Sequence, residues 1–194
     1  MNNLSSVNEK LEKIKNNEKM LKTSEKYSYL KNKFGKYMYA GIDSNKKGVH
    51  VVIDLNDFIP YKYKDDYGEI VEFLMYMSLE AEVLTTYCDQ TYYTVHFRQE
   101  KCTIKNFSIK LFKYLINFFS DFLNSGEKVV DDIYIYSPSG FFSNVYKVVQ
   151  GSLSDSIKRR MKLINNEKEM VSVFPNINKN YDYLNSKFIG EATF

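Results

Sequence analysis

The sequence has few of the residues that most often reveal a site. Its 194 residues include two cysteines, two histidines and three arginines. Cys88 and Cys102 stand in no Cys-x-x-Cys spacing, and His50 and His96 complete no Cys/His zinc pattern. We therefore expect no metal, no cofactor and no structural disulfide, which is typical of a reduced, cytoplasmic protein.

Long apolar runs are also missing. No stretch approaches the roughly 18 apolar residues of a membrane-spanning helix, so we expect no membrane partner. The first residues lead into a charged segment and not into a signal peptide. With 44% hydrophobic and 26% charged residues, the composition favours one folded domain with a sizeable core over a disordered chain.

Positive charge is concentrated near the N-terminus. Residues 1–33 contain eight lysines and four glutamates, while the whole chain carries a net charge of only +3. The remainder is close to neutral and poor in arginine, the planar donor that favours phosphate and base recognition. We therefore expect no direct nucleic-acid partner. The basic run Lys158–Lys162 is either a solvated helix end or a contact for phosphate or anionic lipid.

Alternating and helical patterns predict the elements of the body. In Val49–Asn56 every odd position is aliphatic, which indicates a strand with one buried face. The predicted strands are 37–42, 49–57, 80–88, 91–98, 131–136 and 142–149, and the first two are joined by turn residues. The predicted helices are 65–78, 105–123 and 154–170.

The middle six elements have the order β-α-β-β-α-β, which is the ferredoxin-like split pattern. We expect an α+β sandwich with both helices on one face of an antiparallel sheet, preceded by an extra N-terminal hairpin strand. The predicted divisions are a helical or disordered tail over 1–35, a ferredoxin-like domain over 36–150, and a C-terminal helix with an irregular tail over 151–194. An oligomerisation helix is the alternative for the N-terminal tail, because apolar residues there follow a 3-4 spacing.

A candidate site follows from this predicted topology. Strands 49–57 and 91–98 would lie side by side, with their aliphatic side chains toward the helices. The opposite face would gather polar and aromatic side chains from four strands: His50, Asp54, Glu80, Glu82, Tyr92, His96, Arg98, Tyr134 and Tyr136. Three uses of this face remain open, namely a solvated surface, a ligand pocket and an oligomer interface. A register shift of one residue would move any strand's contribution to the other side.

Two stretches resemble enzymes that consume S-adenosylmethionine. The run Gly48–Leu55 resembles the first strand of small bacterial S-adenosylmethionine decarboxylases. Tyr92–Phe97 lacks the serine at which that family cleaves itself, which argues against pyruvoyl chemistry. The order of elements over 48–149, with the strands Thr94–Arg98 and Ile133–Tyr136, is similar to that of phage S-adenosylmethionine lyases and of the SAM-AMP lyases of type III CRISPR systems.

The second resemblance implies a metal-free lyase that forms trimers and holds its ligand between subunits. Such an enzyme would cleave S-adenosylmethionine or SAM-AMP to methylthioadenosine and a lactone. By this resemblance Glu82, or else Glu80, is the catalytic carboxylate, and the other residues of the face bind the adenosyl substrate. The alternatives are a non-catalytic module that binds a small nucleotide, and an oligomeric interaction module.

Overall fold

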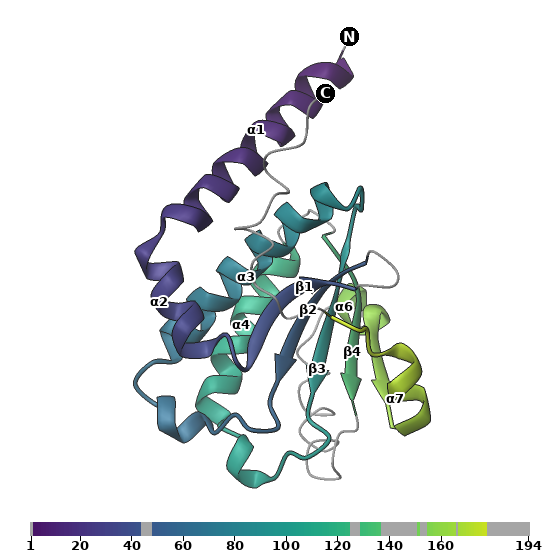
Figure 1. Cartoon of the computed structure of the whole chain (residues 1–194). Helices are drawn as coiled ribbons and strands as arrows, with labels where there is room; N and C mark the ends of the chain where they lie inside the picture. The colour runs from purple at the N-terminus through teal and green to yellow at the C-terminus, as the bar shows by residue number, and fades with distance from the viewer. Residues whose placement is uncertain are drawn as a thin grey trace.

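A five-stranded mixed sheet organises the chain (Figure 1). The computed structural model describes residues 2–43, 48–124, 129–136, 151, 155–165 and 167–177. The strands are β1 (Met38–Ile42), β2 (Val49–Asp54), β3 (Tyr93–Arg98), β4 (Val130–Tyr136) and β5 (Met161–Ile164), and they lie in this order. β1 pairs antiparallel with β2, which confirms the predicted hairpin, and every other pairing is parallel.

The helices are α1 (Asn2–Thr23), α2 (Glu25–Phe34), α3 (Tyr67–Tyr87), α4 (Ile109–Asn124), α6 (Asp155–Arg160) and α7 (Glu167–Val173), with 3₁₀ turns η1 (Pro60–Tyr63) and η2 (Ile104–Asn106). The helices α1 to α4 cover one face of the sheet in two layers. α3 packs on β1, β2 and β3 and contacts α4, while α1 and α2 lie on the outer side of α3 (Figure 1). α3 and α4 each join two parallel strands, the connection that parallel pairing requires.

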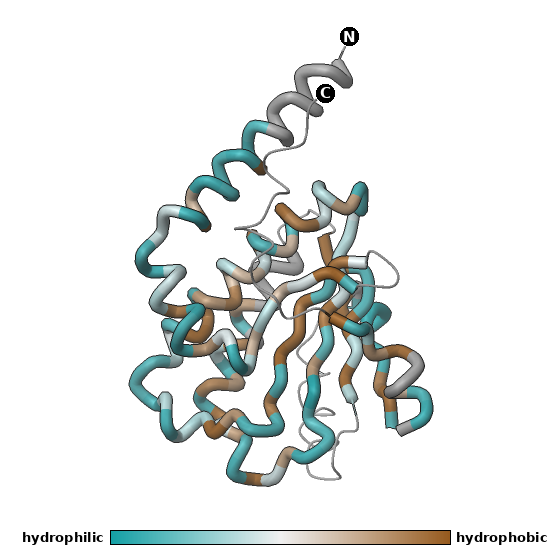
Figure 2. The backbone as a smooth tube through the Cα atoms, viewed as in Figure 1, coloured by the Kyte–Doolittle hydropathy of each residue, from teal (hydrophilic) through white to brown (hydrophobic). Residues whose placement is uncertain are grey.

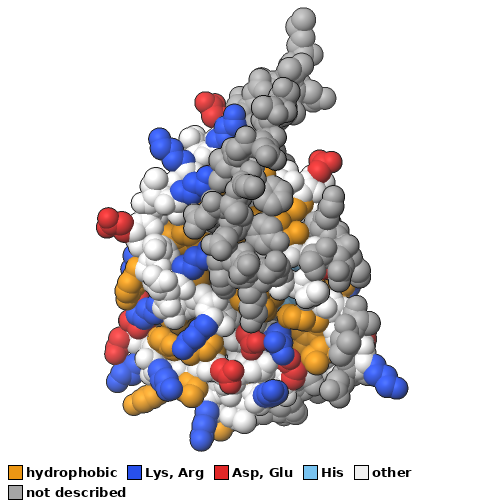
Figure 3. Space-filling view, in the orientation of Figure 1, with side chains coloured by type: hydrophobic (Ala, Val, Ile, Leu, Met, Phe, Trp, Pro, Cys, Tyr) orange, Lys and Arg blue, Asp and Glu red, His pale blue; other side chains and the backbone are white. Residues whose placement is uncertain are grey.

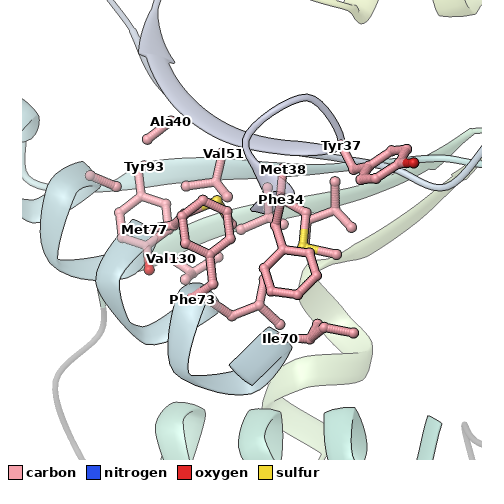
Figure 4. Packing of buried hydrophobic residues seen from close by; sticks show 14 of the residues in the cluster. Phe34, Tyr37, Met38, Ala40, Val51, Ile70, Phe73, Met77, Tyr93 and Val130 are labelled. Atoms are coloured by element: carbon pink, nitrogen blue, oxygen red, sulfur yellow. The ribbon is translucent and has the colours of Figure 1, made fainter. Parts of the chain in front are cut away.

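The main core lies between the sheet and α3. Phe73 and Met77 of α3 meet Val51 of β2 and Tyr93 of β3, and Phe34 at the end of α2 extends the same cluster (Figure 4). Hydrophobic residues accordingly run along the central strands in Figure 2. This burial is the main stabilising contribution to the fold, since apolar area removed from water contributes about 25 cal/mol per Å².

The predicted ferredoxin-like fold is wrong because residues 80–88 are not a strand. α3 continues through them to Tyr87. Its buried residues Phe73, Met77, Ala81 and Leu84 recur every three or four positions, the spacing of one helix face. Asp89, with φ of 53°, ends the segment in a left-handed conformation. With that strand removed, the fold is α/β with a mostly parallel sheet.

The C-terminal segment differs from its prediction as well. Residues 154–170 were expected to form one helix, but they contain α6, the edge strand β5 and the start of α7. β5 has only four residues, too few for alternation to reveal it, and Lys162 lies within it. The predicted strand 142–149 lies outside the described residues.

The N-terminal helices pack on the body through both apolar and polar contacts. Leu21 of α1 and Leu30 of α2 are buried. Glu18, which interrupts the apolar spacing of α1, accepts hydrogen bonds from the Tyr87 hydroxyl and from Lys22, each at 2.6 Å. Glu18 therefore links α1 to the end of α3, because it receives a donor from each helix.

Candidate functional site

The sheet face turned away from α3 carries two rows of aligned side chains. Strand register places residues in line across neighbouring strands, and positions two apart project to the same face. The first row is Tyr39, Val52, His96, Tyr134 and Lys162, and the second is Asp54, Arg98, Tyr136 and Ile164. We call these two rows, together with His50, the aromatic sheet face.

A hydrogen-bonded chain crosses the centre of this face. His50 Nδ1 lies 2.9 Å from His96 Nε2, and His96 Nδ1 lies 2.7 Å from the Tyr136 hydroxyl. The exposed fraction is 1% for His96 and 0% for Tyr136. Burial, together with the neighbouring His50, lowers the pKa of His96 to about 3. His96 is therefore a neutral, fully engaged imidazole at physiological pH.

Gly48 leaves room for this chain. A Cβ at Gly48 would lie 2.8 Å from Nε2 of His50. Any larger residue would therefore require the imidazole to shift from its place beside His96. The glycine that begins the run Gly48–Leu55 thus has a packing explanation.

Aromatic rings surround His96. The rings of Tyr134 and Tyr136 are nearly parallel to the His96 ring, at centroid distances of 5.5 and 5.8 Å and interplanar angles of 14° and 13°. Phe174, just after α7, meets the rings of His96 and Tyr136 edge-on, each at 5.6 Å. Offset and edge-on contacts are the favoured arrangements of such rings. A segment distant in sequence therefore completes this part of the face.

The carboxyl ends of β2 and β3 are charged but internally paired. Arg98 contacts Asp54 at 3.1 Å and Glu100 at 2.6 Å, and its guanidinium lies 5.1 Å from the centre of the Phe174 ring. Burial opposes ionisation of Glu100, but hydrogen bonds from its own backbone, Asn56 and Arg98 hold the pKa of Glu100 below its usual value. Arg98 is therefore balanced by two carboxylates.

Lys162, on the edge strand β5, is also paired with an acidic side chain. It donates to Asp132 at 2.6 Å and lies 5.3 Å from the centre of the Tyr134 ring, and the hydrogen bond to Asp132 raises the pKa of Lys162. Lys158 pairs with Asp155 at 3.3 Å, and Arg160 donates to the Val130 carbonyl at 3.1 Å. The basic run predicted from the sequence is therefore divided among separate local partners.

The structure brings together six of the nine residues selected from the sequence: His50, Asp54, His96, Arg98, Tyr134 and Tyr136. Tyr92 precedes β3 and is 38% exposed, outside both rows. Glu80 and Glu82 lie on α3, across the sheet from the histidines. The Glu80 carboxylate accepts from the Tyr27 hydroxyl at 2.5 Å and from Lys31 at 3.2 Å, which links α2 to α3.

Sequence reasoning missed Tyr39, Phe174 and the two β5 members of the face, Lys162 and Ile164. Tyr39 is 4% exposed, and burial raises its pKa to about 12. Pairing the predicted hairpin across its turn would have placed Tyr39 opposite Val52. Phe174 gave no local signal, because tertiary folding alone brings it to His96.

The described residues contain no group of three or more His, Cys, Asp or Glu side chains that could hold a metal ion. An apolar cavity of about 20 Å³ lies on the helix side of the sheet, lined by residues including Val51, Met77 and Phe118. That volume holds about one water molecule, so it is too small for an organic ligand.

Comparison with known proteins places this geometry in a family. The model of the CRAL/TRIO domain matches residues 10–182. The fold is similar to the crystal structure of Sfh5, with a TM-score of 0.60 and 12% sequence identity over 88% of this chain. The present chain spans 62% of the length of that chain. No curated protein matches the sequence.

These findings overturn the resemblance to S-adenosylmethionine and SAM-AMP lyases. The matched family and the parallel sheet leave no basis for lyase activity or for a role in phage or CRISPR defence, so the predicted enzyme is wrong. The alternative of a non-catalytic binding module agrees better with the match. A small-molecule ligand fits the family, while the predicted adenosyl ligand and trimer gain no support from it. No helix among the described residues is long and apolar enough to cross a bilayer.

Proposed function

We propose, because this chain belongs to the CRAL/TRIO domain family, that it binds a small lipophilic molecule against the aromatic sheet face. Domains of this family bind small lipophilic ligands. The observation that carries the proposal to this chain is the row of Tyr39, Val52, His96 and Tyr134 across four neighbouring strands.

The chemistry of the face suits such a ligand. Pockets for small molecules are lined mainly by apolar and aromatic side chains, with a few placed polar groups. Here the half-buried Tyr134 and Phe174 supply the apolar surface, beside the buried Tyr39, Val52 and Tyr136. The His50–His96–Tyr136 chain and the Asp54–Arg98 pair supply the polar groups. An amphipathic molecule would therefore find both kinds of contact within one face.

The electrostatics favour binding over catalysis. A general base works best when its pKa lies near the operating pH. The pKa of His96 is lowered to about 3, and both of its ring nitrogens already have hydrogen-bond partners. Arg98 is balanced by Asp54 and Glu100. These groups are arranged to hold a surface together, and not to transfer protons.

Binding of a fluorescent anthroyloxy-labelled stearic acid tests this proposal. Tyr134 is half-buried on the face, so Tyr134→Ala removes ring surface that a ligand would contact. We expect an affinity about tenfold weaker, because burial of such a ring contributes on the order of 1.5 kcal/mol or more.

The matched control is Tyr76→Ala, since Tyr76 is a half-buried tyrosine that packs on Tyr27, at 5.2 Å, in the helical layer. The control should leave the affinity within about twofold of the original value. Absence of probe binding, or equal losses in the two variants, would overturn the proposed function.

A further inference from the structure

Three large apolar side chains protrude where β2 and β3 end. Tyr61 of η1 is 75% exposed, Ile104 of η2 is 69% exposed and Ile109, the first residue of α4, is 65% exposed. η1 and η2 contact each other, so these side chains belong to one end of the molecule, the lower end in Figure 1. Single exposed apolar residues are ordinary, but a group rimmed by charge is typical of an interaction surface.

The backbone at this end is firmly held. Asn106 Nδ2 donates to the carbonyl oxygens of Leu55, Asn56 and Phe58 at 2.9–3.0 Å. The side chains of Thr103 and Asn106 form a capping box around η2. Ile104 lies between these two capping residues. Its exposure is therefore fixed by a well-bonded turn, which presents the side chain outward.

Six lysines lie in the same segments: Lys62, Lys64, Lys101, Lys105, Lys110 and Lys113. Within the described residues, none of the six has a carboxylate at ion-pair distance. Lysines of α2 differ, since Lys26, Lys31 and Lys33 all pair with acidic side chains of α3 or of the residue before it.

The acidic residues nearby do not cancel this charge. Asp54 and Glu100 contact Arg98, and Asp66 contacts Lys33. Asp57, Asp65 and Asp89 are the remaining carboxylates between residues 54 and 113 that lie outside α3 and outside those pairs, and Asp89 follows the far end of α3. Figure 3 shows lysine and arginine side chains interleaved with hydrophobic ones along the lower edge of the molecule.

We propose that this edge, formed by Tyr61, Ile104, Ile109 and the six lysines, docks on the surface of a bilayer that contains anionic lipid. Lysine on a flexible stem suits a diffuse anionic surface, and each such residue contributes about fivefold to binding there. Apolar side chains that protrude beside lysines can enter the boundary between headgroups and acyl chains. Docking on a membrane surface needs no membrane-spanning helix. The expectation of no membrane partner rested only on the lack of such a helix, so it does not exclude this docking.

The docking surface rests on the proposed function. A chain that binds a lipophilic ligand would take that ligand from a membrane or deliver it to one. β2 and β3 both end at this edge, so Asp54 and Arg98 are the members of the aromatic sheet face nearest to it. Docking would therefore bring that end of the face close to the bilayer.

Co-sedimentation with vesicles tests the docking. The full chain should bind vesicles of phosphatidylcholine mixed with phosphatidylserine, and not vesicles of phosphatidylcholine alone. Ile104→Gln with Ile109→Gln should weaken binding at least about tenfold, since both side chains leave the interface. Met75→Gln is the matched control, because Met75 is 53% exposed on α3.

A second pair of variants separates local from net charge. Lys105→Glu with Lys110→Glu should abolish measurable binding, whereas Lys15→Glu with Lys19→Glu makes the same charge change on exposed positions of α1 and should lower affinity far less. Equal losses in the two pairs would overturn the proposal. Failure to bind either vesicle would overturn it too, as would capture by soluble polyglutamate without binding to vesicles.

The anthroyloxy-stearate assay keeps the two proposals apart. Edge variants should bind this probe in solution as the original chain does, because the changes lie outside the aromatic sheet face. Vesicle binding without probe binding would refute the proposed function and leave the docking surface standing. Probe binding without vesicle binding would refute the docking surface alone.

Discussion

His96 shows how one residue can be both polar and part of a packed interior. It is buried, yet each ring nitrogen has a partner, and three aromatic rings pack around it. A neutral imidazole meets these conditions at little cost, whereas a charged one would be desolvated beside His50. The centre of the face therefore depends on the protonation state of this side chain.

A loss of stability in acid follows from His96. Its pKa falls from an ordinary 6.5 to about 3 in the folded chain. The unfolded state thus binds a proton first, so this stabilisation is complete above about pH 6.5 and is lost as the pH falls toward 3. Between pH 7 and pH 5 the loss from this group should be about 2 kcal/mol.

Urea unfolding at the two pH values measures this loss. His96→Gln keeps a donor and an acceptor but does not titrate, so its stability should fall by about 2 kcal/mol less over the same range. An equal fall in both proteins would show that His96 is not the responsible group.

Helix α3 shows why the fold was harder to predict than the face. The alternation of Ala81 and Val83 with Glu80 and Glu82 suits a strand, but the spacing from Phe73 to Leu84 fits one helix face equally well, and tertiary packing decides between them. The wrong topology still placed β2 beside β3, because the ferredoxin-like pattern sets these two segments side by side in antiparallel orientation, whereas the observed β-α-β crossover pairs them in parallel. The alternation within each strand then gave the correct side for His50, His96 and Arg98.

Other parts of the site lacked such signals. β5 is short and lies between two helices, so no periodicity marks it. Phe174 reaches His96 only after the chain has folded around the sheet. The sequence therefore predicted the site residues on strands with regular alternation, and not those on β5 or after α7.

The packing of α2 on α3 yields a further prediction, on Glu80. Its buried carboxylate accepts hydrogen bonds from the Tyr27 hydroxyl and the Lys31 ammonium. Glu80→Ala would remove the buried carboxylate that the hydroxyl and the ammonium both contact, so the free energy of unfolding should drop by about 2–3 kcal/mol. Glu72→Ala is the control, because the Glu72 side chain is 41% exposed and contacts Lys26 only at 3.7 Å; it should cost less than about 0.5 kcal/mol. Similar costs in denaturant titrations would refute a structural role for Glu80.

At the scale of the molecule, the two sides of the sheet differ in composition and in packing. The helical side holds the main core and has a cavity for about one water molecule. The other side has the aligned aromatic and polar rows, completed by Phe174. Lysines of α2 are used in ion pairs within the protein, whereas those near η1 and η2 lack such partners among the described residues.

Ionic strength should separate docking from ligand binding. Exposed charges separated by more than about 8 Å are screened at physiological salt, and more salt weakens attraction to anionic vesicles further. Raising salt should therefore release the protein from vesicles while its affinity for anthroyloxy-stearate in solution changes little. A parallel fall of both affinities would contradict separate surfaces for the two interactions.

Native mass spectrometry of the purified chain tests the central claim most directly. We predict that the chain takes up one anthroyloxy-stearate molecule, and that Tyr134→Ala markedly reduces the bound fraction while Tyr76→Ala does not. Detection of the bare chain alone at saturating probe, or unchanged uptake by the Tyr134 variant, would contradict ligand binding at the aromatic sheet face.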